Sequence, residues 1–159
     1  MSRPRLGVSL SRAHHAFMAA LDEQLKACGL APPVRPGMGP VLFELLEQDD
    51  LTLSELSARA RLAPSTITEI TAKMVAAGLV RRRPDVQDGR ASRLRLTPKA
   101  RALRSRLSDL DRRLERVLAA ELSAGEVTLL AGLLDRLRSA LTEGRARRRR
   151  ERSKANKLV

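Results

Sequence analysis

The sequence predicts a mainly α-helical protein with one small β-hairpin. Residues 53–77 fit two short helices joined by a tight turn, and residues 79–96 fit a hairpin rich in arginine. Helices with leucine stripes are expected before and after this stretch. With 159 residues, the chain is long enough for one domain with a real core. Two helices followed by a basic hairpin make a winged helix-turn-helix, a fold that usually binds duplex DNA.

The composition narrows the classes of partner. The net charge is +13, and 26 of the 31 basic residues are arginine, which suits a polyanion without separating DNA, RNA and a membrane surface. The absence of Trp and Tyr argues against a single-strand binder that stacks bases on aromatic rings. No apolar run is long enough to span a bilayer. The one cysteine, Cys28, cannot form an internal disulfide, so we expect a cytoplasmic protein in a reducing compartment.

The N-terminal part is expected to hold a long helix and a short one. Residues 1–8 are predicted to be a flexible basic arm, followed by a helix over residues 9–27. The apolar stripe of this helix is Leu10, Phe17, Leu21, Leu25 and Cys28. Pro and Gly residues predict a loop before a short helix at residues 41–47. The acidic pair Asp49-Asp50 comes next, in a turn, and is expected at the surface.

The next two helices form the predicted helix-turn-helix. Thr52 and Glu55 make a capping box that starts the first of them. The second should begin at Pro64, because proline is tolerated at the first helical position. Its inner face carries Ile67, Ile70, Thr71 and Met74, and its outer face carries Ser65, Thr68, Glu69, Ala72, Lys73 and Ala76. Small and hydrogen-bonding side chains suit a helix that lies against base-pair edges, and Gly78 is placed to end it.

The hairpin is expected to have one apolar and one cationic face. Its strands are predicted at residues 79–83 and 92–96, where Leu94 and Leu96 alternate with Arg93 and Arg95. The segment 84–90 carries Pro, Asp and Gly turn signals. We therefore expect the hairpin to project with Arg90 near its tip.

Two more helices are predicted after the hairpin. Thr97 and Pro98 start one that runs to about residue 122, and a second capping box, Ser123 with Glu126, starts one over residues 124–141 that Gly144 ends. Residues 145–159 contain eight Lys or Arg and one Glu, and are predicted to be a disordered basic tail. The terminal helices are longer than a winged helix needs, so we expect them to join two copies. A two-fold dimer would place two recognition helices about 34 Å apart on DNA.

Over roughly residues 10–142 the chain resembles the MarR-type (multiple antibiotic resistance) transcription regulators. The resemblance is carried by Gly78-Leu79-Val80-x-Arg82, then Pro84-Asp85-x-x-Asp88-x-Arg90-Ala91, then Leu96-Thr97. Leu53-Ser54-Glu55-Leu56 and Pro64-Ser65-Thr66-x-Thr68 are also similar to that family. The chain departs from it at Glu69, where many members carry a base-contacting arginine. It also departs at Ala63, in place of an Asp cap, and at Ala100, in place of Gly.

The resemblance implies a homodimer on a pseudo-palindromic operator. It implies that residues 35–97 form the DNA-binding part of a single domain at 9–144, and that residues 9–30 and 98–144 form the dimer. It also implies that Arg90 enters the minor groove and that Asp88 holds the wing by ion pairing. A pocket for a small, often anionic aromatic effector is implied near the first helix, with His14, Phe17 and Met18 as candidate ligand-binding residues.

The candidate DNA-binding residues each have a structural alternative. The set is Ser54, Pro64, Ser65, Thr66, Thr68, Glu69, Lys73, Arg81, Arg82, Arg83, Asp88 and Arg90. Ser65, Thr66 and Thr68 could serve as ordinary helix caps instead of contacting DNA. The arginines of residues 81–83 suit phosphate or packing contacts better than base readout. Arg90 could be a solvated turn residue. A buried structural thiol is favoured for Cys28 over a redox sensor.

No catalytic constellation, metal site or cofactor motif is recognisable, so we expect a binding protein rather than an enzyme. Two functions remain open. One is a dimeric, sequence-specific transcription regulator, in the first place a ligand-responsive repressor. The other is a sequence-tolerant architectural protein that binds DNA or RNA through its basic tail. The ratio of specific to random affinity separates them.

Overall fold

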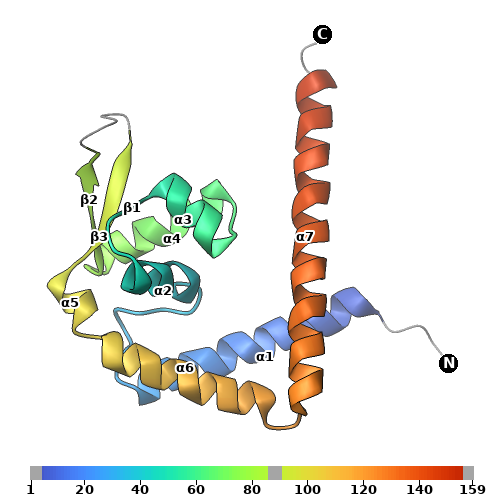
Figure 1. Ribbon diagram of the computed structural model, residues 1–159, viewed down its shortest axis with the longest axis horizontal. Coiled ribbons are helices and arrows are strands. Elements are labelled where there is room, and N and C mark those ends of the chain that lie inside the picture. The colour runs from blue at the N-terminus through green and yellow to red at the C-terminus, as the bar shows by residue number, and fades with distance from the viewer. Residues whose placement is uncertain (1–4, 86–90, 156–159) are drawn as a thin grey trace. The chain divides into compact units, whose positions relative to one another are not determined.

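Figure 1 shows the computed structural model, which describes residues 5–85 and 91–155. The chain divides into two compact units, residues 1–114 and 115–159. The elements, in chain order, are α1 (Leu6–Ala27), α2 (Gly39–Glu47), β1 (Leu51–Thr52), α3 (Leu53–Ala60), α4 (Pro64–Ala76), β2 (Val80–Pro84), β3 (Ser92–Leu96), α5 (Pro98–Arg101), α6 (Arg104–Ala119) and α7 (Ala124–Ala155). The predicted class, mainly α with a small hairpin and a winged helix-turn-helix, is confirmed.

The first unit contains a three-stranded antiparallel sheet in the order β1-β3-β2. The β2–β3 hairpin was predicted, and its register pairs Val80 with Leu96 and Arg82 with Leu94. Strand β1 was not predicted; it pairs Leu51 with Leu94 on the other edge of β3. Two residues are too few to show an alternating pattern, so this strand is visible only once the fold brings it beside β3.

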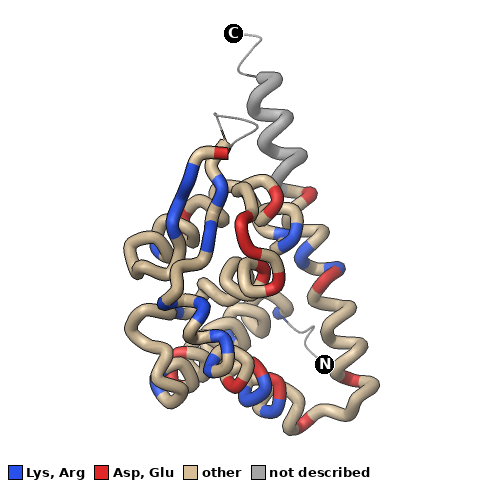
Figure 2. Tube along the Cα trace, turned by 60° about the vertical axis from the view of Figure 1, so that its left-hand side comes forward, with Lys and Arg blue, Asp and Glu red and all other residues tan. Residues whose placement is uncertain are grey.

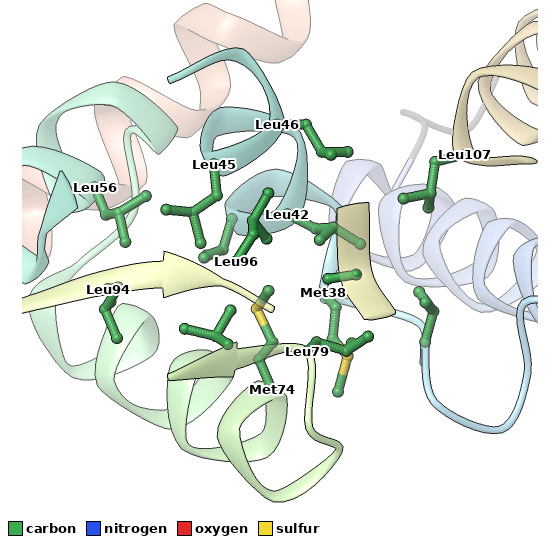
Figure 3. Close-up of a cluster of buried hydrophobic side chains, with 14 of the residues drawn as sticks. Met38, Leu42, Leu45, Leu46, Leu56, Met74, Leu79, Leu94, Leu96 and Leu107 are labelled. Carbon is green, nitrogen blue, oxygen red and sulfur yellow. The ribbon is translucent and has the colours of Figure 1, made fainter. Parts of the chain in front are cut away.

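The core lies between the sheet and the helices of the first unit, as Figure 3 shows. Leu94 and Leu96 of β3 are buried with Met74 of α4, which confirms the predicted inner faces of the hairpin and of the second helix. Other buried members come from α1, α2, α3 and α6, and include Leu25, Leu42, Leu45, Leu56 and Leu107. These residues orient α4 relative to the hairpin, because close packing leaves little freedom for either to shift.

The predicted helix caps are confirmed. In the first capping box, the Thr52 N–H donates to Glu55 Oε2 at 2.6 Å and the Glu55 N–H donates to Thr52 Oγ1 at 3.2 Å. Helix α4 begins at Pro64 and is followed by Gly78 at a φ of +70°, the left-handed conformation that a helix C-terminus favours. Thr97 caps α5 by accepting from the Ala100 N–H, and Ser123 with Glu126 forms the second box before α7.

Three predicted boundaries are wrong. Helix α1 starts at Leu6, inside the expected flexible arm. The expected single helix over residues 98–122 is interrupted: the Leu103 N–H donates to Ala100 O, three residues back, and the chain turns between α5 and α6. Leucine spacing continues through this turn, so periodicity alone could not reveal it. Ala100, in the turn of helix before the break, is buried.

The third wrong boundary is the end of α7. The backbone is helical to Ala155, past Gly144 and through most of the expected disordered tail. A single interior glycine costs a helix only about 1 kcal/mol, and the following Arg, Ala, Glu and Lys residues favour the helix. Within the described parts of the chain, no single helix is long and apolar enough to cross a bilayer; only α6 and residues 124–144, as a bent pair, would do so by length and composition.

The sheet opposes arginine to arginine across its two longer strands. Arg81 faces Arg95, and Arg83 faces Arg93. Like charges at directly opposed positions destabilise a strand pair, so this face of the hairpin requires acidic partners.

Asp50 and Asp85 provide two of these partners. Asp50 Oδ2 accepts from Arg83 Nη2 at 2.9 Å, and its main-chain oxygen accepts from Arg93 Nε at 3.0 Å. Asp85 Oδ2 accepts from Arg93 Nη1 at 2.8 Å. Asp50 reaches this position in a left-handed backbone conformation, with φ of +66°. The chain between α2 and β1 is therefore tied to both strands of the hairpin.

Asp49 ties the same segment to the end of β3 and to α5. Its Oδ1 accepts from the Leu96 N–H at 2.8 Å, and its Oδ2 accepts from Arg101. Oδ2 also lies 3.8 Å from Arg95 Nε. Both acids are partly buried, each with 27% of its side chain exposed, so the expectation that the pair would be an ordinary surface feature is wrong. We call Asp49 and Asp50 the acidic anchor.

The charge of Asp49 contributes to stability. Burial by itself raises the pKa of its carboxyl, but the hydrogen bonds from Arg101, Leu96 N–H and Asp50 N–H outweigh burial and hold the pKa below its ordinary value of 3.8. A group whose pKa is lower in the folded state stabilises the fold above its unfolded pKa. That contribution is lost as the pH falls through the folded pKa.

We expect Asp49→Ala to lower the free energy of unfolding by about 1.5–3 kcal/mol at neutral pH, because charge-assisted hydrogen bonds disappear. Asp49→Asn keeps an acceptor but loses the charge, so its effect should be smaller and should shrink as the pH falls below about 4. Urea unfolding at one protein concentration measures both. Asp109→Asn, at an exposed position on α6, should change stability by less than about 0.5 kcal/mol. A loss for Asp49→Ala no larger than for this control would contradict the anchor.

Candidate nucleic-acid interface

The outer face of α4 is free of the core. Ser65, Thr68, Glu69, Ala72, Lys73 and Ala76 are all exposed, whereas Ile67, Thr71 and Met74 are buried beneath them. Thr66 is half-buried, at the edge of this face. The exposed face is polar, and none of those six residues has a large apolar side chain. It can therefore approach a base-pair edge closely, and the predicted division of α4 into an inner and an outer face is confirmed.

Two interactions organise the polar groups of this face. Thr68 Oγ1 donates to Pro64 O at 2.8 Å, which leaves the hydroxyl oxygen free to accept from a base amino group. Lys73 Nζ donates to Glu69 Oε1 at 2.6 Å, one helical turn along. This hydrogen bond, helped by the lysine charge, holds the pKa of Glu69 below its ordinary value, so the carboxylate is ionised at neutral pH.

The first turns of α3 and α4 add two of the predicted residues. Ser54 is exposed at the second position of α3, and Pro64 is exposed at the first position of α4. Helix N-termini carry unpaired N–H groups and a partial positive charge, which suit phosphate oxygens. Together, Ser54 and the start of α4 can position the winged helix on a DNA backbone without reading sequence.

The hairpin arginines divide into two kinds, and Figure 2 shows the cations along both strands. Arg81 and Arg82 are exposed, and no carboxylate within the described residues pairs with either. Arg83 is bonded to Asp50, so part of its capacity is committed to the fold. Arg81 and Arg82 are thus the described wing residues that remain available for phosphate contacts. Asp88 and Arg90, the predicted wing-tip residues, lie outside the described residues.

Sequence reasoning missed the residues that hold the hairpin in place. Arg93 was noted only as a cation on the outer face, yet it bonds Asp85 and the Asp50 main chain and lies 3.8 Å from Glu55 Oε2. The hydrogen bond to Asp85 leads the causes that raise the pKa of Arg93. Two adjacent acids just before a capping box, in a chain of net charge +13, were the available signal. Their partners could not be assigned without the strand register.

The candidate effector residues share one face of α1 by their spacing. His14 is exposed, Phe17 is 36% exposed and Met18 is half-buried. Cys28, just beyond α1, is half-buried and packs against the core of the first unit. Within residues 5–85 and 91–155, no group of three or more His, Cys, Asp or Glu is arranged to hold a metal ion.

Comparison with known proteins gives consistent matches. Residues 40–92 match the MarR family model. The chain is 34% identical over 88 residues to the HTH-type transcriptional repressor IacR of Pseudomonas putida. The match covers 55% of this chain and 50% of that protein. The chain thus spans about half the length of this curated relative.

Solved structures match over most of the chain. A probable transcriptional regulator from Pseudomonas aeruginosa is 28% identical, with a TM-score of 0.69 over 84% of this chain and 96% of that one. The PcaV regulator of Streptomyces coelicolor, solved with its natural ligand, is 26% identical, with a TM-score of 0.70 over 89% of this chain and 99% of that one. The chain is therefore similar to the MarR family over residues 40–92, and it shares the fold of these solved transcriptional regulators.

Proposed function

We propose that this protein is a sequence-specific regulator of transcription that binds duplex DNA as a homodimer and acts as a ligand-responsive repressor. The observation that carries the proposal is the exposed polar face of α4, held by a shared core beside a hairpin with available Arg81 and Arg82. A polar helix face without large apolar side chains fits the major groove of DNA, and cations on an adjoining strand fit the phosphate backbone. The similarity to the repressor IacR supports repression.

The dimer is proposed from apolar side chains that the second unit leaves uncovered. Five leucines of α7 are between 45% and 63% exposed: Leu129, Leu130, Leu133, Leu134 and Leu141. A contiguous exposed apolar surface of this kind usually marks an interface. A second copy is the occupant that would also align two α4 helices with a two-fold operator.

Ligand control is proposed from the likeness to PcaV, whose structure contains its natural ligand. The candidate contacts on this chain are His14, Phe17 and Met18 of α1, for a small aromatic effector. Such a ligand changes DNA affinity only if it binds one arrangement of the two winged helices of the dimer better than another.

The alternative, a sequence-tolerant DNA- or RNA-binding protein, rests on the charge after Gly144. The net charge of residues 145–159 is +7, on a backbone that is helical as far as Ala155. A basic segment of this kind neutralises phosphates whatever the sequence. In the proposed function it adds affinity while α4 supplies selectivity.

The first prediction tests the hairpin. Arg81→Ala should weaken binding to operator and random duplexes to a similar extent and reduce the slope of log affinity against log salt by about 1, because the protein then neutralises one phosphate fewer. Arg90→Ala should cost on the order of 1–3 kcal/mol of operator binding while the dimer stays intact. Fluorescence anisotropy at several salt concentrations measures both.

The matched control for these variants is Arg113→Ala, an exposed arginine of α6 outside the winged helix. If Arg81→Ala and Arg90→Ala both bind as tightly as this control, the hairpin takes no part in DNA binding.

The second prediction tests the dimer. Leu130→Arg or Leu134→Arg should give monomers or unfolded chains, because a buried interface would have to accept an unpaired charge. Sedimentation reports the mass and circular dichroism reports folding. Thr128→Arg, at an exposed polar position of α7, is the control and should leave both unchanged. A wild-type protein that sediments as a monomer at micromolar concentration would refute the two-fold arrangement.

The third prediction separates the contribution of the basic segment to DNA binding from that of the winged helix. Deleting residues 145–159 should weaken operator and random DNA by similar factors and flatten the salt dependence of both, by about 0.9 for each phosphate that the segment neutralises. The ratio between the two affinities should survive, because the α4 face remains. Loss of that ratio would mean that the segment reads sequence, and no change in affinity or slope would mean that it does not bind this DNA.

A further inference from the structure

Glu69 occupies an unexpected place for an acid. It is the only acidic residue of α4, and it lies in the middle of the face proposed to meet DNA. Its side chain is 68% exposed, so it has no role in the core. Its neighbours along this face, Ser65, Ala72 and Ala76, are too small to screen it from a base-pair edge. A carboxylate here must be placed against a polyanion whenever the protein binds.

Lys73 offsets this cost only in part. Its ammonium lies 2.6 Å from Glu69 Oε1, and its side chain is 59% exposed, so the ammonium has donors left for another acceptor. The pair therefore presents one negative and one positive group, side by side, to whatever the helix contacts. The carboxylate has only acceptors, and desolvating it without a donor is costly.

In the major groove, the donors are the amino groups of cytosine (N4) and adenine (N6), whereas thymine and guanine present carbonyl oxygens at corresponding positions. In a G·C pair, the cytosine amino group stands next to the O6 and N7 acceptors of guanine. An acceptor beside a lysine matches this pattern. A lysine contacts guanine well, and an acidic side chain accepts well from cytosine N4.

We propose that Glu69 determines operator sequence by selecting a cytosine amino group in the major groove, with Lys73 donating to the guanine of the same base pair. This inference rests on the proposed function, because it requires α4 to enter the major groove. The selection works largely by exclusion: a thymine at that position would set its carbonyl oxygen against the carboxylate. Glu69 thus lowers affinity for most sequences and spares those with a G·C pair in register.

The experiment is selection of bound fragments from random duplexes by the full-length wild type, Glu69→Gln and Glu69→Arg, followed by affinity measurements on matched sites. For the wild type, changing the selected C·G pair to T·A should weaken binding about 10-fold, the discrimination expected of a good base contact. Glutamine has a donor as well as acceptors, so Glu69→Gln should reduce this preference to about twofold or move it to adenine. Arginine donates to guanine, so Glu69→Arg should move the preference to guanine.

Two further readouts separate base selection from a structural role. Glu69→Gln should bind random duplexes more tightly than the wild type, because a negative charge leaves the DNA-facing surface. Glu23→Gln, which removes an exposed acid from α1, should change neither the selected sequence nor the preference at that pair. Preferences at the other operator positions should persist in both variants.

The outcomes distinguish this inference from the proposed function. If the wild type enriches no sequence, sequence-specific regulation itself fails. If the wild type enriches an operator and Glu69→Gln enriches the same one with the same preference at every pair, Glu69 does not select a base and the proposed function stands. An operator with no cytosine preference that depends on Glu69 would likewise overturn the inference.

Discussion

The acidic anchor, Asp49 and Asp50, allows a hairpin of opposed arginines to form beside the exposed face of α4. Arg83 and Arg93 face each other across β2 and β3 and would repel. The anchor and Asp85 turn this repulsion into a set of hydrogen bonds that join the α2–β1 segment, both strands and α5. Since Asp49 and Asp50 directly precede β1 and the capping box of α3, the same few residues also set where the helix-turn-helix begins.

A consequence of the anchor is that the hairpin charges have separate roles. Arg93 is committed to the fold and Arg83 is committed in part, while Arg81 and Arg82 extend to solvent. A DNA-binding protein needs cations that are both available and held in place. Here the committed arginines hold the strands, so that the available ones are presented on an ordered backbone. Counting arginines in the sequence would overestimate the number of phosphate contacts, because part of that charge is already neutralised within the protein.

The face of α4 also combines opposite charges. A helix that carried only cations and hydroxyls would bind any DNA, since phosphate attraction does not depend on sequence. In the proposed complex Glu69 would oppose that attraction close to the bases, while its hydrogen bond from Lys73 keeps the carboxylate ionised and oriented. Specificity obtained by penalising wrong sequences suits a chain whose net charge of +13 already supplies affinity. In the proposed function, the basic segment after Gly144 and the acid on α4 would act in opposite senses on random DNA, the first raising affinity and the second lowering it.

Local patterns in the sequence determined the helix-turn-helix, the β2–β3 hairpin and the helix caps, because capping boxes, Pro64, Gly78 and alternation in 92–96 act over a few residues. They also determined which face of α4 is exposed. Tertiary structure decided what depends on distant partners: the pairing of β1 with β3, the break between α5 and α6, and the role of Asp49 and Asp50. These acids bond residues 33 to 52 positions away, and no short-range pattern records such a partner. The continuation of α7 past Gly144 is the opposite case, in which the helix propensity of the following residues outweighs the stop signal of a single glycine.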